Sequence, residues 1–177
     1  MPPVLLYIIL GSSLVGELPA WLIYLQTWCY FVYRVLDNLS QVHAKQSENQ
    51  SPLFQMFDHG IDCLSLGILS LFYLRVMQTG YNFVSTAFIV AEFANFYLAT
   101  LSEYYTGRLI LPYFNGVSDG SLAIVSLSFI VGIVGNDFFT QSMFDLSILN
   151  WTGITDLTMG QLLTMILTVY NCVHALF

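Results

Sequence analysis

Positive charge is the scarcest feature of this sequence. Only 4 of its 177 residues are Lys or Arg, against 11 Asp or Glu, and the formal net charge is -7. A nucleic-acid-binding surface needs a basic face, so this balance excludes nucleic acid as a partner. Charged residues of either sign make up 8% of the chain, whereas a soluble domain carries about 25%. The composition therefore excludes an ordinary soluble domain and favours a membrane protein.

Cysteine is also scarce. The chain has 3 cysteines, Cys29, Cys63 and Cys172, and each lies in an apolar run. Their spacing matches neither a zinc site nor a disulfide framework. We therefore expect three buried, unreactive thiols.

Hydrophobic residues, by contrast, make up 56% of the chain and gather in long runs. A helix needs about 20 apolar residues to cross the hydrocarbon core of a bilayer, which is about 30 Å thick. Candidate runs, the first of them short, cover residues 3–15, 19–38, 53–77, 81–101, 121–135 and 157–177. The polar stretch before residue 53 is a loop or a helix extension into water. We predict an all-α integral membrane protein, a bundle of about six transmembrane helices in a single domain over residues 1–177.

Carboxylates inside this apolar chain are the candidate functional groups. In the stretch LFQMFDHGIDC, Asp58 and Asp62 stand four residues apart, and this spacing places them on one face of a helix. Asp37 lies near the end of the preceding helix, so a helical hairpin brings all three together. Three converging carboxylates suit a hard cation such as magnesium, manganese or calcium. The alternative is a helix end that dips into water at Asp58, and the spacing alone favours neither interpretation.

Two motifs resemble those of a known family. The stretch LDNLSQVHAKQSENQSPLFQMFDHGID is similar to the signature of the CDP-alcohol phosphotransferases, D-x2-D-G-x2-A-R-x8-G-x3-D-x3-D, and most of all to the choline/ethanolamine branch. The stretch EYYTGRLILPYFNGVSDG resembles a second motif of the same branch. The resemblance covers roughly residues 21–122 and runs without gaps through the signature.

The resemblance implies a chemistry and a set of site residues. In the family, four aspartates hold two divalent metals, Mg or Mn, that bridge the diphosphate of a CDP-alcohol, and the hydroxyl of diacylglycerol then attacks. Asp37, Asp58 and Asp62 match the first, third and fourth aspartates. His59 and Glu103 match the two residues from which the branch draws its base for the lipid hydroxyl.

On the nucleotide side, the sequence departs from the family pattern. Ala44 is kept, but Ser40 replaces the second aspartate and Gln41 the first glycine. Lys45 replaces the arginine and keeps its charge without the forked geometry, and Phe54 replaces the second glycine. These losses, together with a length shorter than is usual for the branch, favour a degenerate member without catalytic activity.

Two functional hypotheses follow. The first is an inactive structural subunit of a membrane complex, which contacts membrane lipids and other membrane subunits. It holds a phospholipid in the cavity that corresponds to the substrate site of the family. The second is an active aminoalcohol phosphotransferase that transfers phosphocholine or phosphoethanolamine from a CDP-alcohol to diacylglycerol in phospholipid synthesis. In this second case Asp37, Asp58 and Asp62 bind one metal, Mg or Mn, whereas the inactive subunit has no cofactor. A transporter or channel lacks the expected inverted repeat. For a complex subunit we expect the mitochondrial inner membrane, and otherwise the endoplasmic reticulum or Golgi membrane.

Overall fold

The computed structural model describes residues 18–47, 51–107, 118–135, 137–140, 142–145 and 156–176. Almost all of this described part is α-helical, as the sequence predicts, apart from one short antiparallel strand pair. The elements are α2 (Ala20–Gln46), α3 (Pro52–Val76), α4 (Phe83–Thr106), α5 (Ser118–Val134), α6 (Asp137–Thr140), β1 (Ser142–Asp145), β2 (Asp156–Thr158) and α7 (Met159–Leu176). The helix predicted over residues 3–15 lies outside the described residues.

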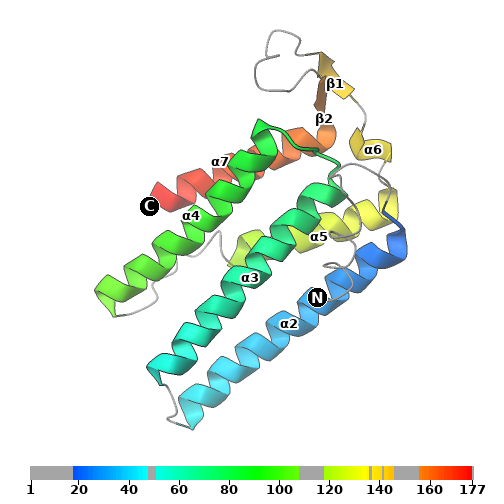
Figure 1. Ribbon diagram of the computed structural model, residues 1–177. Helices are drawn as coiled ribbons and strands as arrows, with labels where there is room; N and C mark the ends of the chain where they lie inside the picture. The colour runs from blue at the N-terminus through cyan, green and yellow to red at the C-terminus, as the bar shows by residue number, and fades with distance from the viewer. Residues whose placement is uncertain are drawn as a thin grey trace.

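The long helices form a bundle in which α2 and α3 run antiparallel (Figure 1). α5 packs against both of them, while α4 packs against α3 on one side and α7 on the other. The carboxyl end of α2, the amino end of α3 and the carboxyl end of α4 lie together at the same end of the bundle (Figure 1). This end brings the first motif close to Glu103, the first residue of the second motif.

Local sequence signals set where the site-bearing helices begin and end. The Ser51 side chain accepts a hydrogen bond from the Phe54 amide at 3.1 Å, and Pro52 occupies the first helical turn, so α3 starts just before the acidic stretch. Gly107 adopts a left-handed conformation, with φ 66°, and ends α4 just after Glu103. α2 extends eight residues beyond the predicted boundary at residue 38, to Gln46, so the polar stretch begins as a helix extension.

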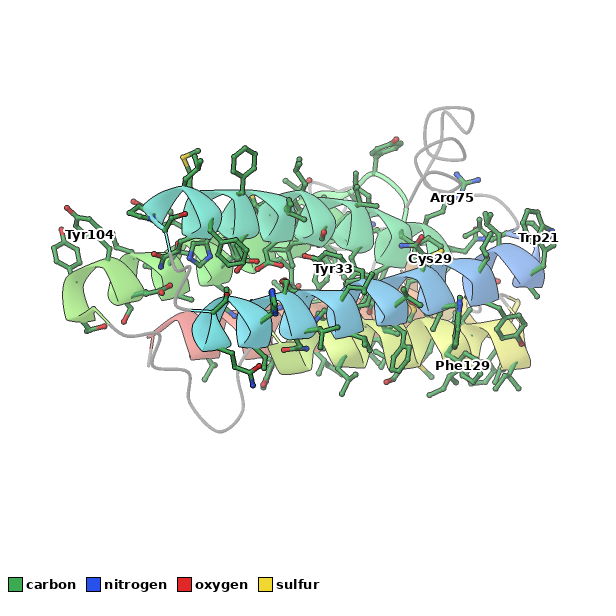
Figure 2. All side chains as sticks on the ribbon, turned by 90° about the horizontal axis from the view of Figure 1, so that it is seen from below. Trp21, Cys29, Tyr33, Arg75, Tyr104 and Phe129 are labelled. Carbon is green, nitrogen blue, oxygen red and sulfur yellow. The ribbon has the colours of Figure 1, made fainter. Side chains whose placement is uncertain are left out.

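Within the described ranges, two helices, α3 and α4, are long and apolar enough to cross a membrane. At about 1.5 Å per residue they measure about 37 and 36 Å, which exceeds the hydrocarbon thickness of about 30 Å. α5 and α7 contain shorter apolar segments, so about six spans remains a prediction. The side chains of Trp21 and Tyr104 lie at opposite ends of the bundle and are 63% and 81% exposed (Figure 2). Such aromatic residues are typical of the two membrane–water interfaces.

The cysteine prediction needs one correction. All three thiols are free, but Cys172 is exposed and Cys29 and Cys63 are only half-buried. The outer face of a membrane bundle is itself apolar, because it contacts lipid rather than water. Apolar neighbours in the sequence therefore do not show that a residue points into the bundle.

Candidate functional site

Three carboxylates from two helices meet at the shared end of the bundle. Asp37 on α2 and Asp58 and Asp62 on α3 each offer an oxygen, and these oxygens lie within 4.8 Å of one another. Two oxygens bound to one Mg²⁺ or Ca²⁺ lie about 3.0 to 4.8 Å apart, since the metal–oxygen distances are about 2.1 and 2.4 Å. The donor set therefore fits one hard divalent cation. Without a cation, three like charges at this separation repel one another.

The α2 helix also supplies polar partners to two of these carboxylates. The Tyr33 hydroxyl donates a hydrogen bond to Oδ1 of Asp62 at 2.5 Å. The Arg34 guanidinium lies 3.5 Å from Oδ2 of Asp37, one turn along the same helix. The Arg34 guanidinium offsets part of the negative charge of the cluster, and both contacts restrict how its side chains can turn.

Two of the substituted positions on α2, Ser40 and Gln41, bond to residues of the cluster. The Ser40 hydroxyl donates to the main-chain carbonyl oxygen of Asp37 at 2.8 Å, so it is engaged with its own helix. The Gln41 amide nitrogen donates to Oδ2 of Asp58 at 3.3 Å. Where the resemblance places an acidic ligand and a glycine, the chain thus has a hydroxyl bound to the backbone and an amide bound to a carboxylate.

A second polar group lies next to the cluster, between α3 and α4. The His59 Nε2 atom is 3.3 Å from Oε2 of Glu103, and Gln55 donates to the other carboxylate oxygen at 2.9 Å. The His59 ring also meets the edge of Phe96, with ring centroids 6.5 Å apart. His59 directly follows Asp58 on α3, so this pair lies beside the acidic cluster.

The other residues predicted on the nucleotide side, Ala44, Lys45 and Phe54, differ in burial and in whether their side chains are described. Ala44 is buried and Phe54 is half-buried near the start of α3. The backbone of Lys45 belongs to α2, but its side chain lies outside the described part of the structure. Residues 108–117, which form most of the second motif, lie outside it as well.

Sequence reasoning missed three partners of the site. Tyr33 lies one helical turn before Asp37, and Gln55 lies one turn before His59. This four-residue spacing is a signal that could have identified both. Arg34, three residues before Asp37, follows the same rule. Tyr33 and Gln55 bond to residues on a neighbouring helix, Asp62 and Glu103. These pairings depend on how the helices align, which the spacing does not reveal.

Sequence reasoning also missed a buried acid away from the site. Glu92 lies near the middle of α4 and is 2% exposed. The Asn171 amide on α7 donates to Oε1 of Glu92 at 2.7 Å, and Asn95 donates to Asn171 at 3.3 Å. A carboxylate in mid-membrane requires such partners. This group therefore joins α4 to α7.

Comparison with known proteins agrees with the motifs. The chain is 34% identical over 122 residues to choline/ethanolaminephosphotransferase 1 of Saccharomyces cerevisiae, a match that covers 67% of this chain and 30% of the relative. The chain is similar to CDP-alcohol phosphatidyltransferases. It is also 29% identical over 157 residues to an uncharacterized CDP-alcohol phosphatidyltransferase class-I family protein 2 of Dictyostelium discoideum, covering 89% of this chain and 35% of the relative. No family model matches the chain.

A third relative has a specific activity in its name. Cholinephosphotransferase 1 of Saccharomyces cerevisiae is 32% identical over 120 residues, covering 67% of this chain and 30% of the relative. The chain spans about a third of the length of the curated relatives it matches. Two of these three relatives are thus named as phosphotransferases, and the third as a member of the CDP-alcohol phosphatidyltransferase class-I family.

Proposed function

We propose that this chain is a CDP-alcohol phosphotransferase-like membrane protein that binds one divalent cation, Mg²⁺ or Mn²⁺, and has lost phosphotransfer. In this role it is a structural subunit that holds a phospholipid. The observation that carries the proposal is the pair of contacts at Ser40 and Gln41, beside three carboxylates that converge within 4.8 Å.

The charge of the site supports one cation rather than two. Asp37, Asp58 and Asp62 supply three negative charges, whereas two divalent cations carry four positive ones. A fourth acidic ligand is missing at Ser40, whose hydroxyl is bound to the backbone. Loss of one charged ligand from a two-metal site can cost a rate factor of about 10² to 10⁴.

The nucleotide side of the site supports loss of transfer independently of the charge. A glycine on a helix lets a ligand approach the backbone closely, and Gln41 fills that space with a side chain bound to Asp58. Phe54 adds an aromatic ring at the start of α3, where the resemblance places the second glycine. A CDP-alcohol would have to displace the Gln41 side chain to reach this oxygen of Asp58.

The other half of the site supports retention of a phospholipid. Three carboxylate oxygens leave about three of the six positions around Mg²⁺ free for water or a phosphate oxygen. The His59–Glu103 pair lies beside the cluster and offers polar groups to a lipid headgroup. Exposed apolar side chains surround this end of the hairpin, among them Leu39 and Phe57, and suit acyl chains or a protein partner.

A membrane location agrees with the two spanning helices and with the relatives. The proposed partners are membrane lipids and other membrane subunits. For the compartment we keep both hypotheses, the mitochondrial inner membrane for a complex subunit and the endoplasmic reticulum or Golgi membrane otherwise. Organelle fractionation, followed by purification of the endogenous protein from each membrane fraction in mild detergent, tests both.

The decisive test of the lost transfer is an activity assay. The purified full chain is supplied in mixed micelles with diacylglycerol, Mg²⁺ or Mn²⁺, and CDP-choline or CDP-ethanolamine, and CMP release is measured. We expect no release above that of the Asp58→Ala variant, while yeast choline/ethanolaminephosphotransferase 1 serves as the positive control. Turnover that Asp58→Ala abolishes would contradict the proposal.

The same assay tests the alternative, an active aminoalcohol phosphotransferase. One observation favours it: the His59–Glu103 pair is in place, 3.3 Å apart, beside the three aspartates. Under this alternative, CMP release should depend on Glu103 as well as on Asp58. A single cation would then suffice for transfer.

A further inference from the structure

Tyr33 connects the two helices that carry the acidic cluster. Its hydroxyl, on α2, donates to Oδ1 of Asp62 on α3, 29 residues further along the chain, at 2.5 Å. Tyr33 is half-buried. It lies between α2 and α3 (Figure 2). The hydroxyl therefore contacts the α3 part of the cluster from the facing helix.

This contact affects the direction of the Asp62 carboxylate. A hydrogen bond to one carboxylate oxygen restricts rotation of the whole group and so fixes the direction of the other oxygen. Asp37 lies one turn after Tyr33 on the same face of α2, so the hydroxyl and the first carboxylate approach α3 from the same side. Such outer partners of metal ligands commonly contribute about 10- to 100-fold to metal affinity.

We propose that Tyr33 is a positioning residue for the divalent cation. It orients Asp62 so that a carboxylate oxygen stays directed at Asp37 and Asp58, and it does not itself bind the metal. This inference rests on the cation site of the proposed function. It adds a residue outside the signature motif on which that site depends.

A merely structural role for Tyr33 makes a different prediction. As a simple tie between α2 and α3, the hydroxyl would contribute to stability in a chelator and leave the cation affinity unchanged. Tyr33→Phe removes the hydroxyl and keeps the ring. Tyr30→Phe is the matched control, because the Tyr30 ring lies 5.9 Å from that of Tyr33 while its hydroxyl partner is Ser121 on α5.

The experiment measures Mn²⁺ binding to the full chain in detergent by the electron paramagnetic resonance of free Mn²⁺. We expect Tyr33→Phe to weaken binding about 10- to 100-fold, and Tyr30→Phe to stay within about 3-fold of the wild type. Thermal unfolding in EDTA is measured for both variants alongside. A second measurement uses the wild type and Tyr30→Phe, in which Mg²⁺ should produce a tyrosine ultraviolet difference spectrum, whether or not Tyr33→Phe folds.

Each outcome separates this inference from the proposed function. Equal Mn²⁺ affinity in Tyr33→Phe and the wild type overturns the role of Tyr33 and leaves the cation site standing. Equal losses in Tyr33→Phe and Tyr30→Phe also overturn it, because the effect then belongs to packing. A wild-type chain that binds no Mn²⁺ overturns the site and the inference together. A missing difference spectrum in a wild type that does bind Mn²⁺ overturns the inference alone.

Discussion

Ser40→Asp restores the missing acidic ligand and tests the proposal that the site binds one cation rather than two. Ser40 lies three residues after Asp37 on α2, so the two side chains are neighbours on the helix surface, with Cβ atoms about 5–6 Å apart. In the wild type the Ser40 hydroxyl bonds the Asp37 carbonyl and adds no charge to the cluster. The substitution adds a fourth carboxylate to three that already lie within 4.8 Å of one another.

We expect Ser40→Asp to lower the free energy of unfolding without a divalent cation and to raise it with one. At an effective dielectric constant of about 20, two like charges 5–6 Å apart repel by about 3 kcal/mol before screening by water and salt. The site is half-buried, so we expect a net loss of about 1–2 kcal/mol in the free energy of unfolding in EDTA. With divalent ions the added charge is attractive, and we expect two Mn²⁺ per chain instead of one.

The assay compares Ser40→Asp with Ser40→Asn, which has nearly the same shape without the charge. Thermal unfolding in detergent is followed by circular dichroism in EDTA and again with excess Mg²⁺. In EDTA the aspartate variant should melt about 2–8 °C below the asparagine variant, and Mg²⁺ should reverse the order. Equal melting temperatures in EDTA, with no gain in bound Mn²⁺, would refute the account of Ser40.

Two further predictions concern packing and are checked by unfolding measurements. A Cβ atom at Gly160 would lie 2.2 Å from the Met77 carbonyl oxygen, so Gly160→Ala should destabilise by about 3 kcal/mol or more. Gly60→Ala, with open space around it, is the control and should be neutral or slightly stabilising. Equal losses of stability in the two variants would contradict the close contact between Gly160 and Met77. Asn171→Leu removes the donor of Glu92 and should cost about 1–3 kcal/mol, which a second substitution, Glu92→Leu, should largely recover. A double variant no more stable than the single one would argue against this pair.

The helices of the described part follow from the sequence because their signals are local. Apolar runs of about 20 residues and breaks at Pro52 and Gly107 are properties of neighbouring residues. The sequence does not determine whether α2 ends at residue 38, because a polar stretch beyond an apolar run can be a helix in water or a loop. The helix continues to Gln46.

The site could be predicted only in part, for a physical reason. The spacing of Asp58 and Asp62 and the hairpin with Asp37 depend on helix periodicity, and the structure brings the three together. The contacts of Tyr33 and Gln41 depend on how far α2 is shifted along α3, which no local pattern specifies. For the same reason the sequence indicates that an acid is missing at residue 40, but not where the hydroxyl that replaces it bonds.

The number of divalent ions bound per chain tests the central claim most directly. We would titrate Mn²⁺ into the purified full chain in detergent by isothermal calorimetry, with Asp58→Asn as the control. The account predicts one Mn²⁺ per chain in the wild type and none at that site in the variant. Two ions in the wild type, or one that survives Asp58→Asn, would contradict it.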